Sequence, residues 1–307
     1  MNDGSETDEG AVAGRHRAGF VALIGLPNVG KSTFLNHVLG RKLAIVTPKP
    51  QTTRNRILGI VNRPDAQYLF LDTPGLHRPR NLLGQRMVKV AQQSREEADV
   101  VLWVVDAERA SSEEEEQIGR DLVAGGRPLV VALNKIDRAS RPDILARVAA
   151  LGANAPGRHV VPLSARTGEN VEELLTTLRD HLPASPPLYP PEAETDLPER
   201  FFAAEIIREQ LLLGTHEEVP YQCAVRIDDW TEREGRDLVV LSASIVVARK
   251  SQKGIVIGEK GQRLREIGRR ARGGLETFFG IRFYLDLRVG VDAKWFRREH
   301  SLTEFGL

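Results

Sequence analysis

The chain has 307 residues, and its 43 Lys and Arg nearly balance 42 Asp and Glu, which leaves a formal net charge of +1. A hydrophobic content of 41% is enough for a core and excludes a largely disordered chain, while the length suggests two domains. The single cysteine, Cys223, excludes an intramolecular disulfide and a cysteine-rich zinc site. Because it lies in an apolar run typical of a strand, we expect a small buried residue.

Residues 1–17 form an acidic segment that includes Asp3, Glu6 and Asp8. The segment contains no apolar stretch, so we predict a disordered leader and not a secretory signal. The longest apolar run, Val100–Val105, is far shorter than the roughly 20 residues that cross a membrane. A soluble, cytoplasmic protein is therefore expected.

Residues 18–182 alternate short apolar runs with amphipathic stretches. Predicted strands cover residues 20–24, 68–71, 100–105, 129–133 and 160–163, and a further strand at 57–61 is expected to pair antiparallel with 68–71. Predicted helices cover residues 32–39, 82–95, 113–123, 142–151 and 170–181. This alternation predicts an α/β domain with a doubly wound, mostly parallel sheet.

The stretch 183–199 holds six of the chain's 17 prolines and is predicted to be a stiff, extended linker. Residues 200–307 follow a different order: a helix (202–213), two strands (224–230 and 238–247), a glycine-punctuated basic stretch (253–279), a strand (283–289) and a short helix near Trp295. This order predicts a small α+β domain.

The segment Gly25–Ser32 matches the pattern GxxxxGK[ST] between a predicted strand and a predicted helix, the context that a phosphate-binding loop needs. Its backbone N–H groups can face phosphate oxygens, and the start of the helix adds a favourable partial charge. Lys31 is expected to hold the β- and γ-phosphates, and Ser32 to offer a hydroxyl to Mg²⁺. The predicted nucleotide-contacting residues of this loop are Gly25, Asn28, Val29, Gly30, Lys31, Ser32 and Thr33. These residues indicate a P-loop domain, and an ordinary glycine-rich turn is the weaker interpretation.

The segment Asp72-Thr73-Pro74-Gly75 directly follows a predicted strand. In that place Asp72 can hold Mg²⁺ through water, and the Gly75 N–H can contact a γ-phosphate, which would make this loop sensitive to hydrolysis. Ras-type enzymes have a water-orienting glutamine directly after such a motif, whereas this chain has Leu76. Slow intrinsic turnover, or a water positioned by another group, is therefore expected.

A switch threonine that coordinates Mg²⁺ and senses the γ-phosphate is expected between the P-loop and Asp72. We predict Thr53 for this role, with Thr52 as the second choice and a plain surface loop as the alternative. The predicted catalytic residues are Lys31, Thr53 and Gly75, and the predicted metal ligands are Ser32, Thr53 and Asp72.

The segment Asn134-Lys135-Ile136-Asp137 follows another predicted strand and indicates guanine as the base. The Asp137 carboxylate can accept both the N1–H and the 2-amine of guanine, whereas adenine would leave it unpaired. Asn134 can address the O6/N7 edge and tie neighbouring loops together, and the Lys135 stem can lie over the ring. Backbone N–H groups of the next candidate loop, Ser164 and Ala165, can reach O6. The motifs in this order predict a GTPase that binds GTP and GDP with Mg²⁺.

The basic stretch contains a GxxG segment, Gly258-Glu259-Lys260-Gly261, between an apolar run and a basic helix. Two glycines allow close approach of a nucleic-acid backbone, an adjoining apolar groove can receive unstacked bases, and the cations can contact phosphates. The predicted RNA-contacting residues are Lys253, Gly254, Ile257, Gly258, Glu259, Lys260, Gly261, Arg263, Arg265 and Arg269. A solvated basic helix face is the alternative.

Together these motifs, with Gln51-Thr52-Thr53-Arg54, Glu199-Arg200-Phe201-Phe202 and Ser251-Gln252-Lys253-Gly254, make the chain resemble the Era GTPases of the TrmE–Era branch. The resemblance covers nearly the whole chain and implies a G domain followed by a type II KH domain. It implies binding to the 3′ end of 16S rRNA and a role in 30S subunit biogenesis. It also implies that Asn28 helps to hold K⁺, although stabilisation of the loop alone is an equal alternative. Glu259 stands where relatives often carry a basic residue.

Two rival functions differ from an RNA-directed GTPase. One is a peripheral membrane signalling GTPase whose basic C-terminal helix binds anionic lipid, and the other is a constitutive RNA-binding module with a structural nucleotide. Between residues 249 and 298 there are 14 basic and five acidic residues, a local net charge of +9 that the acidic remainder hides. We expect a monomer with no disulfide or zinc partner.

Overall fold

The structure is a computed structural model, and it describes residues 16–76, 79, 81–215, 219–233, 235 and 237–307. Most of the predicted acidic leader lies outside these residues. The chain forms two compact units, which are considered one at a time. The first comprises residues up to 44, 56–76 and 90–196, and the second comprises residues 45–55, 77–89 and 197–307. The predicted boundaries at 17/18, 182/183 and 199/200 stay predictions.

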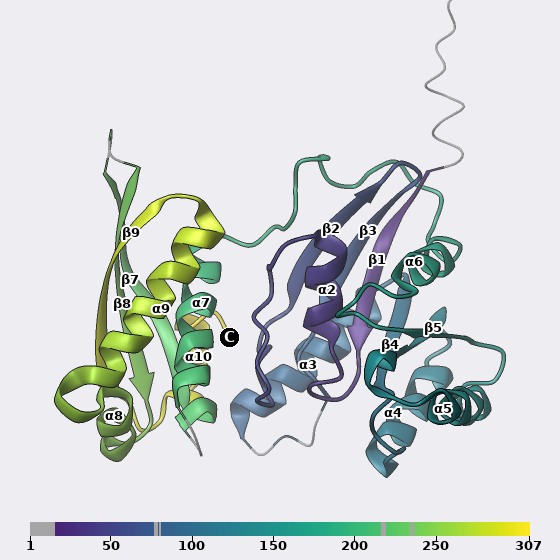
Figure 1. Cartoon of the computed structure of the whole chain (residues 1–307), viewed down its shortest axis with the longest axis horizontal. Coiled ribbons are helices and arrows are strands. Elements are labelled where there is room, and N and C mark those ends of the chain that lie inside the picture. The colour runs from purple at the N-terminus through teal and green to yellow at the C-terminus, as the bar shows by residue number, and fades with distance from the viewer. Residues whose placement is uncertain (1–15, 77–78, 80, 216–218, 234, 236) are drawn as a thin grey trace, which may run out of the picture. The chain divides into compact units, whose positions relative to one another are not determined.

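The first unit is built on a six-stranded sheet with the order β2-β3-β1-β4-β5-β6 (Figure 1). Its strands are β1 Arg17–Ile24, β2 Ile57–Arg63, β3 Ala66–Asp72, β4 Val100–Asp106, β5 Leu129–Asn134 and β6 His159–Leu163. All neighbouring pairs are parallel except β2 and β3, which form the predicted antiparallel pair. The strands are rich in Val, Ile and Leu and are buried on both faces, as parallel strands covered by helices must be.

The helices that connect these strands are α2 Lys31–Leu39, α3 Leu82–Glu97, α4 Glu113–Ala124, α5 Arg141–Asn154 and α6 Val171–Arg179. Side chains of α4 and α5 join a core on one face that includes Trp103 and Val131. Phe34 of α2 packs edge-on against Phe70 of β3 at 5.4 Å. The strand order runs outward from β1 in both directions, so right-handed crossovers place helices on both faces. The prediction of a doubly wound, mostly parallel sheet is confirmed.

The proline-rich stretch lies along the strands of the first unit. The Gln67 side chain accepts hydrogen bonds from the N–H groups of Leu188 and Tyr189 at 2.7 and 3.0 Å and donates to the Tyr189 carbonyl. The Ile60 N–H donates to the Glu194 carbonyl at 2.9 Å. Residues 183–194 are therefore fixed by backbone and side-chain hydrogen bonds.

The second unit contains a three-stranded sheet, β7-β8-β9, in which β7 and β8 are antiparallel and β8 and β9 are parallel. Its elements are α7 Glu199–Gly214, β7 Cys223–Arg233, β8 Leu238–Val247, α8 Lys250–Ile257, α9 Gln262–Phe279, β9 Arg282–Val291 and α10 Glu299–Glu304. Apolar residues of α7 and α9 pack on the sheet, among them Ile207 and Leu275. The order helix, two strands, two helices, strand is that of a type II KH domain, as predicted. Cys223 is fully buried in this core, as expected.

No helix in the described part of the chain is both long and apolar enough to span a lipid bilayer.

Candidate nucleotide and nucleic-acid sites

The P-loop follows β1 and has a backbone that few residue types tolerate. Gly30 has φ 104°, and a Cβ on it would collide with the Asn134 side chain. Gly25 has φ 157°, and a Cβ on it would collide with the Val104 carbonyl. Asn28 has φ 65°, in the left-handed region that asparagine enters more readily than most residues. This backbone conformation is by itself a reason for asparagine at position 28, whether or not an ion binds there.

Lys31 is almost fully buried at the first position of α2. Its Nζ donates to the carbonyls of Gly25 and Leu26 at 3.2 and 3.1 Å, so the P-loop surrounds the ammonium group. Burial lowers the pKa of Lys31 to about 8, against a smaller attraction to Asp72 that raises it. A phosphate in this loop would supply the negative charge that buried Lys31 requires.

Two of the three residues predicted to hold the metal are in contact. The Ser32 hydroxyl donates to Asp72 Oδ2 at 2.6 Å, and Asp72 is fully buried at the end of β3. A Cβ on Gly75 would lie 2.7 Å from the Pro27 nitrogen, so this glycine permits close packing of its loop on the P-loop. Thr53, the third predicted ligand, lies in a segment that belongs to the second compact unit, where 9% of its surface is exposed.

Asn134 connects its own loop with the P-loop and with the loop of Ala165 at the predicted base site. Its Nδ2 donates to the Val29 carbonyl at 2.8 Å, and its Oδ1 accepts from the N–H groups of Lys135 and Ala165 at 2.8 and 2.9 Å. Lys135 Nζ is paired with Asp106 at 2.6 Å. Sequence reasoning missed Asp106, although its place at the end of the predicted 100–105 strand is a signal of the same kind as that of Asp72.

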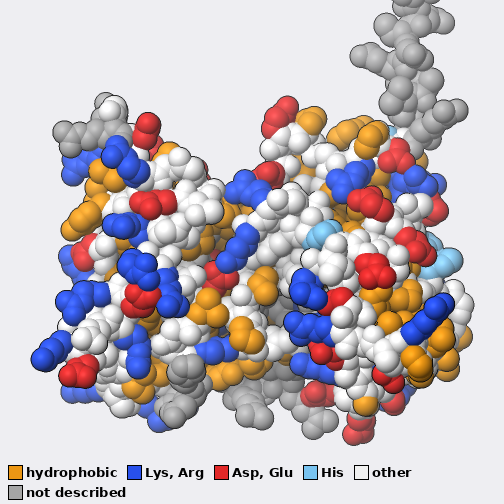
Figure 2. Space-filling model, in the orientation of Figure 1, with side chains coloured by type: hydrophobic (Ala, Val, Ile, Leu, Met, Phe, Trp, Pro, Cys, Tyr) orange, Lys and Arg blue, Asp and Glu red, His pale blue; other side chains and the backbone are white. Residues whose placement is uncertain are grey.

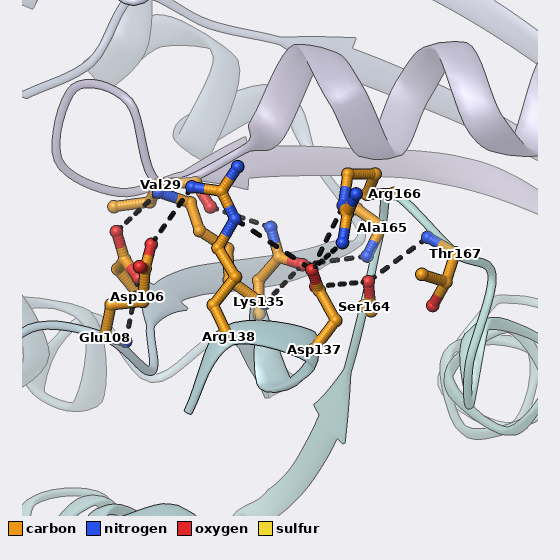
Figure 3. A network of polar contacts seen from close by, with 11 residues as sticks. Val29, Asp106, Glu108, Lys135, Asp137, Arg138, Ser164, Ala165, Arg166 and Thr167 are labelled. Atoms are coloured by element: carbon orange, nitrogen blue, oxygen red, sulfur yellow. Dashed lines mark hydrogen bonds and ion pairs between the residues drawn. The ribbon is translucent and has the colours of Figure 1, made fainter. Parts of the chain in front are cut away.

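The Asp137 carboxylate is held from two sides. Ser164 Oγ donates to Oδ1 at 2.6 Å, and the Arg166 guanidinium donates to Oδ2 through Nη2 at 2.6 Å and Nε at 3.0 Å (Figure 3). Burial raises the pKa of Asp137, but these hydrogen bonds outweigh it, so the pKa lies below the usual value. The carboxylate is therefore ionised and oriented. The N–H groups of a bound guanine would share this carboxylate with Arg166 or replace the hydrogen bonds from Arg166.

In the second unit, α9 and β9 border an open groove of about 530 Å³ that also reaches the GxxG loop. Its lining residues are Lys260, Gly261, Leu264, Arg265, Gly268, Arg269, Arg272, Tyr284, Leu285 and Leu287. Figure 2 shows Lys and Arg side chains gathered on the face of this unit that α8 and α9 cover. The groove thus combines apolar walls with cations at its border.

Of the predicted RNA-contacting residues, four line this groove, Lys260, Gly261, Arg265 and Arg269, and so does Arg272, which belongs to the same predicted row of phosphate-contacting arginines. Others shape the loop: Gly258 has φ 71°, and the Arg263 guanidinium donates to the Ile255 carbonyl at 2.5 Å. Lys253 and Gly254 lie on α8, and Ile257 and Glu259 flank Gly258 outside the groove lining. Sequence reasoning missed five lining residues, Leu264, Gly268, Tyr284, Leu285 and Leu287. The spacing 261, 264, 265, 268, 269 and 272 on one helix face could have revealed two of them, Leu264 and Gly268.

Comparisons with known proteins agree with the two predicted domain types. A family model described as 50S ribosome-binding GTPase matches residues 20–135, and a KH domain model matches residues 218–296. GTPase Era of Geotalea daltonii is 46% identical over 289 residues, which cover 94% of this chain and 97% of that protein. GTPase Era of Geobacter metallireducens is 46% identical over 290 residues, with the same coverage.

Solved structures of similar proteins extend this agreement to the fold. A variant of Aquifex aeolicus Era bound to GDP·AlF₄⁻ superimposes with a TM-score of 0.91 at 42% identity, covering 94% of this chain and 99% of that one. Era in complex with MgGDPNP and nucleotides 1506–1542 of 16S ribosomal RNA also gives a TM-score of 0.91 at 42% identity, covering 95% and 99%. With identity of this level over nearly the whole length, the chain belongs to the Era family of GTPases, with a P-loop GTPase domain followed by a KH domain.

Proposed function

We propose that this GTPase binds single-stranded RNA of the 3′ end of 16S rRNA through its KH domain and acts in 30S subunit biogenesis in the cytoplasm. The observation that carries the proposal is the groove between α9 and β9, where the GxxG loop, four cations and an exposed tyrosine meet. The Era complex with a 16S rRNA segment supports this choice of RNA.

The nucleotide site fits Mg²⁺ together with GTP. The Ser32 hydroxyl and the Asp72 carboxylate already lie 2.6 Å apart, and both are oxygen donors, which Mg²⁺ prefers. Ser32 would bind the ion directly, Asp72 would hold it through water, and Thr53 would complete the set. When bound, the ion would neutralise charge that develops on the phosphates.

In GTP hydrolysis, Lys31 would hold the β- and γ-phosphates and the Gly75 N–H would contact the γ-phosphate. The Leu76 N–H is already committed to the Gly25 carbonyl at 3.1 Å, and its side chain packs against the core of the α4 face. Leu76 therefore offers no group to orient water, which supports slow intrinsic turnover.

K⁺ is a further proposed cofactor, held near the phosphates with the help of the Asn28 side chain. The left-handed backbone of Asn28 favours the competing explanation, a purely structural role. GTPase rates measured in K⁺ and in Na⁺ at equal ionic strength separate the two. Equal rates would remove the potassium ion from the mechanism.

The groove favours RNA over a lipid surface because it is concave and has places for separate bases. Tyr284 is 62% exposed beside Leu285 and Leu287, and an aromatic ring in such a place can stack on a base. Stacking of this kind contributes about 1–3 kcal/mol for each base. Lys260, Arg265 and Arg269 can then contact the phosphates between the stacked bases.

The test is binding of the full chain, loaded with GDP or a non-hydrolysable GTP analogue, to RNA with the 16S 3′-end sequence and to a shuffled RNA. We expect preference for the 16S sequence, and a loss of about tenfold or more for Tyr284→Ala. Leu145→Ala is the matched control, because Leu145 is 64% exposed on α5 and belongs to the first unit. Equal affinity for both RNAs would contradict the choice of 16S rRNA. Binding to anionic vesicles that survives Gly258→Asp together with Gly261→Asp would favour the membrane alternative.

A further inference from the structure

The predicted switch segment belongs to the compact unit that contains the KH domain. The chain leaves the first unit after Ala44 and returns to it at Arg56, and the residues between, 45–55, are called the strap here. The strap includes Gln51-Thr52-Thr53-Arg54, and both of its ends continue into the GTPase unit. What holds the strap therefore acts on the residues expected to sense GTP.

Helix α7 binds the strap at Val46 and at Lys49. The Val46 N–H donates to Glu209 Oε1 at 3.1 Å. Lys49 Nζ donates to the carbonyls of Leu212 and Thr215, at the C-terminal end of α7. A cation is favourable at this position because the last carbonyls of a helix carry partial negative charge.

Arg208, in the middle of α7, contacts the residue directly before Thr53. Arg208 is 3% exposed, and its guanidinium donates to Glu205 on the same helix through Nε at 2.7 Å and Nη2 at 2.6 Å. The same Nη2 donates to the carbonyl of Thr52. Because Glu205 fixes the guanidinium in place, Arg208 presents a rigid donor to the peptide bond between Thr52 and Thr53.

Arg54 anchors the C-terminal end of the strap. Its Nη1 donates to the Cys223 carbonyl at 2.6 Å, its Nη2 donates to the Pro220 carbonyl at 3.1 Å, and its guanidinium lies 5.8 Å from the Trp295 ring centre. Burial, followed by repulsion from Arg208, lowers the pKa of Arg54 to about 10. These two buried cations repel each other, which limits the net stability of the docked strap, while the Glu205 carboxylate attracts both.

We propose that Arg208 is a positioning residue of the GTPase switch, which holds the Thr52–Thr53 peptide so that Thr53 is oriented for the GTP-bound state. The inference rests on the proposed function, in which Thr53 senses the γ-phosphate. It makes α7, a helix that follows the GTPase domain in sequence, part of the machinery that distinguishes GTP from GDP. GDP binding does not require Arg208, since it offers Thr53 no γ-phosphate.

Arg208→Gln in the full chain is the test, with Mg²⁺ and equal concentrations of GDP or a non-hydrolysable GTP analogue. We expect the ratio of GTP-analogue affinity to GDP affinity to fall about tenfold, with GDP affinity unchanged. Amide hydrogen exchange of residues 45–55 should rise in the analogue-bound variant, while exchange in β8 stays the same. Arg208→Lys should restore part of the ratio, because lysine can still donate to the Thr52 carbonyl. Arg200→Gln is the control, because Arg200 is exposed on the same helix.

Lys49→Met provides a second variant, since Lys49 lies on the strap and its loss leaves the Arg208–Glu205 pair intact. If Arg208→Gln disturbs folding, the same fall in the affinity ratio for Lys49→Met supports the proposal. An unchanged ratio in folded Arg208→Gln, or in Lys49→Met where Arg208→Gln does not fold, would overturn it. Thr53→Ala tests the proposed function separately from the inference about Arg208. If Thr53→Ala leaves the affinity ratio unchanged, the proposed switch role of Thr53 fails. If the ratio falls in Thr53→Ala but not in Arg208→Gln, only the inference about Arg208 is refuted.

Discussion

The nucleotide site and the KH groove are organised in different ways. Around the P-loop, buried Asn134 makes two hydrogen bonds that join separate loops, and several glycines lie where any side chain would collide. In the groove, Arg265, Arg269 and Tyr284 are exposed and project from regular elements. The first site is fixed by its own loops, whereas the second is an open surface with cations around apolar walls.

This difference predicts how each site responds to substitution. In the preorganised nucleotide site, changing a single atom should remove much of the nucleotide affinity, because the neighbouring groups cannot move to compensate. In the groove, single changes should have smaller effects, because phosphate contacts are numerous and screened by solvent. The following predictions test this contrast.

Asp137→Asn should have the largest effect, on the identity of the base. The amide keeps the shape of the side chain but cannot accept two hydrogen bonds from guanine, and each such bond to a charged group contributes about 1.5–3 kcal/mol. GTP affinity should fall about a thousandfold, and xanthosine triphosphate should bind better because the amide can donate to its extra carbonyl. Nucleotide titrations measure both, with Asp121→Asn, an aspartate of α4, as control. GTP affinity retained at the wild-type level would refute Asp137 as the group that selects the base.

Gly258→Ala tests a position of the GxxG loop that only glycine tolerates. Gly258 has φ 71° and ψ 178°, and a Cβ there would lie 2.7 Å from the Arg263 Cβ, so the GxxG loop must shift. This backbone conformation costs a residue other than glycine about 1–3 kcal/mol, so RNA affinity should fall about tenfold. Gly273→Ala is the matched control, because Gly273 lies in α9 with open space around its Cα, and alanine should stabilise that helix by about 0.5–1 kcal/mol. Equal RNA affinity in the two variants would show that loop geometry does not limit binding.

The two sites also differ in how far sequence alone predicts them. The motifs around Lys31, Asp72 and Asn134 were predictable because phosphate and base chemistry demands these residue types at strand ends, and the strands have distinct apolar runs. Tyr284 and Leu287 were not found, because their role depends on the α9 face that packs beside β9. The contact between the strap and α7 could not be predicted for the same reason, because only the fold shows that Arg208 donates to the Thr52 carbonyl.

Lys31 gives the nucleotide site a pH dependence. Its folded-state pKa is lowered to about 8 from 10.5, so in the nucleotide-free protein the ammonium loses its proton as pH rises through about 8. Bound phosphates favour the charged form and raise this pKa, so binding takes up a proton and affinity should fall as pH rises above 8, at most tenfold per unit. In the same range, up to about 10.5, the nucleotide-free protein should gain stability, because the unfolded chain binds the extra proton. Calorimetry in buffers of different ionisation enthalpy measures the uptake, and none at pH 8.5 would contradict the shift.

Glu266→Gln should have the smallest effect and the opposite sign. Glu266 accepts hydrogen bonds from Arg269 and Arg270 at 2.6–2.9 Å, and these bonds lower its pKa to about 2. RNA phosphates must compete with this carboxylate for the two guanidinium groups, so the neutral amide should raise RNA affinity a few-fold and steepen its decrease with salt. Acidification to pH 5 should not mimic the substitution, since Glu266 stays ionised there. Glu173→Gln, on α6 of the GTPase unit, is the control. Weaker RNA binding by Glu266→Gln would mean that the carboxylate orients the arginines and does not compete with RNA for them, and the groove would then be preorganised like the nucleotide site.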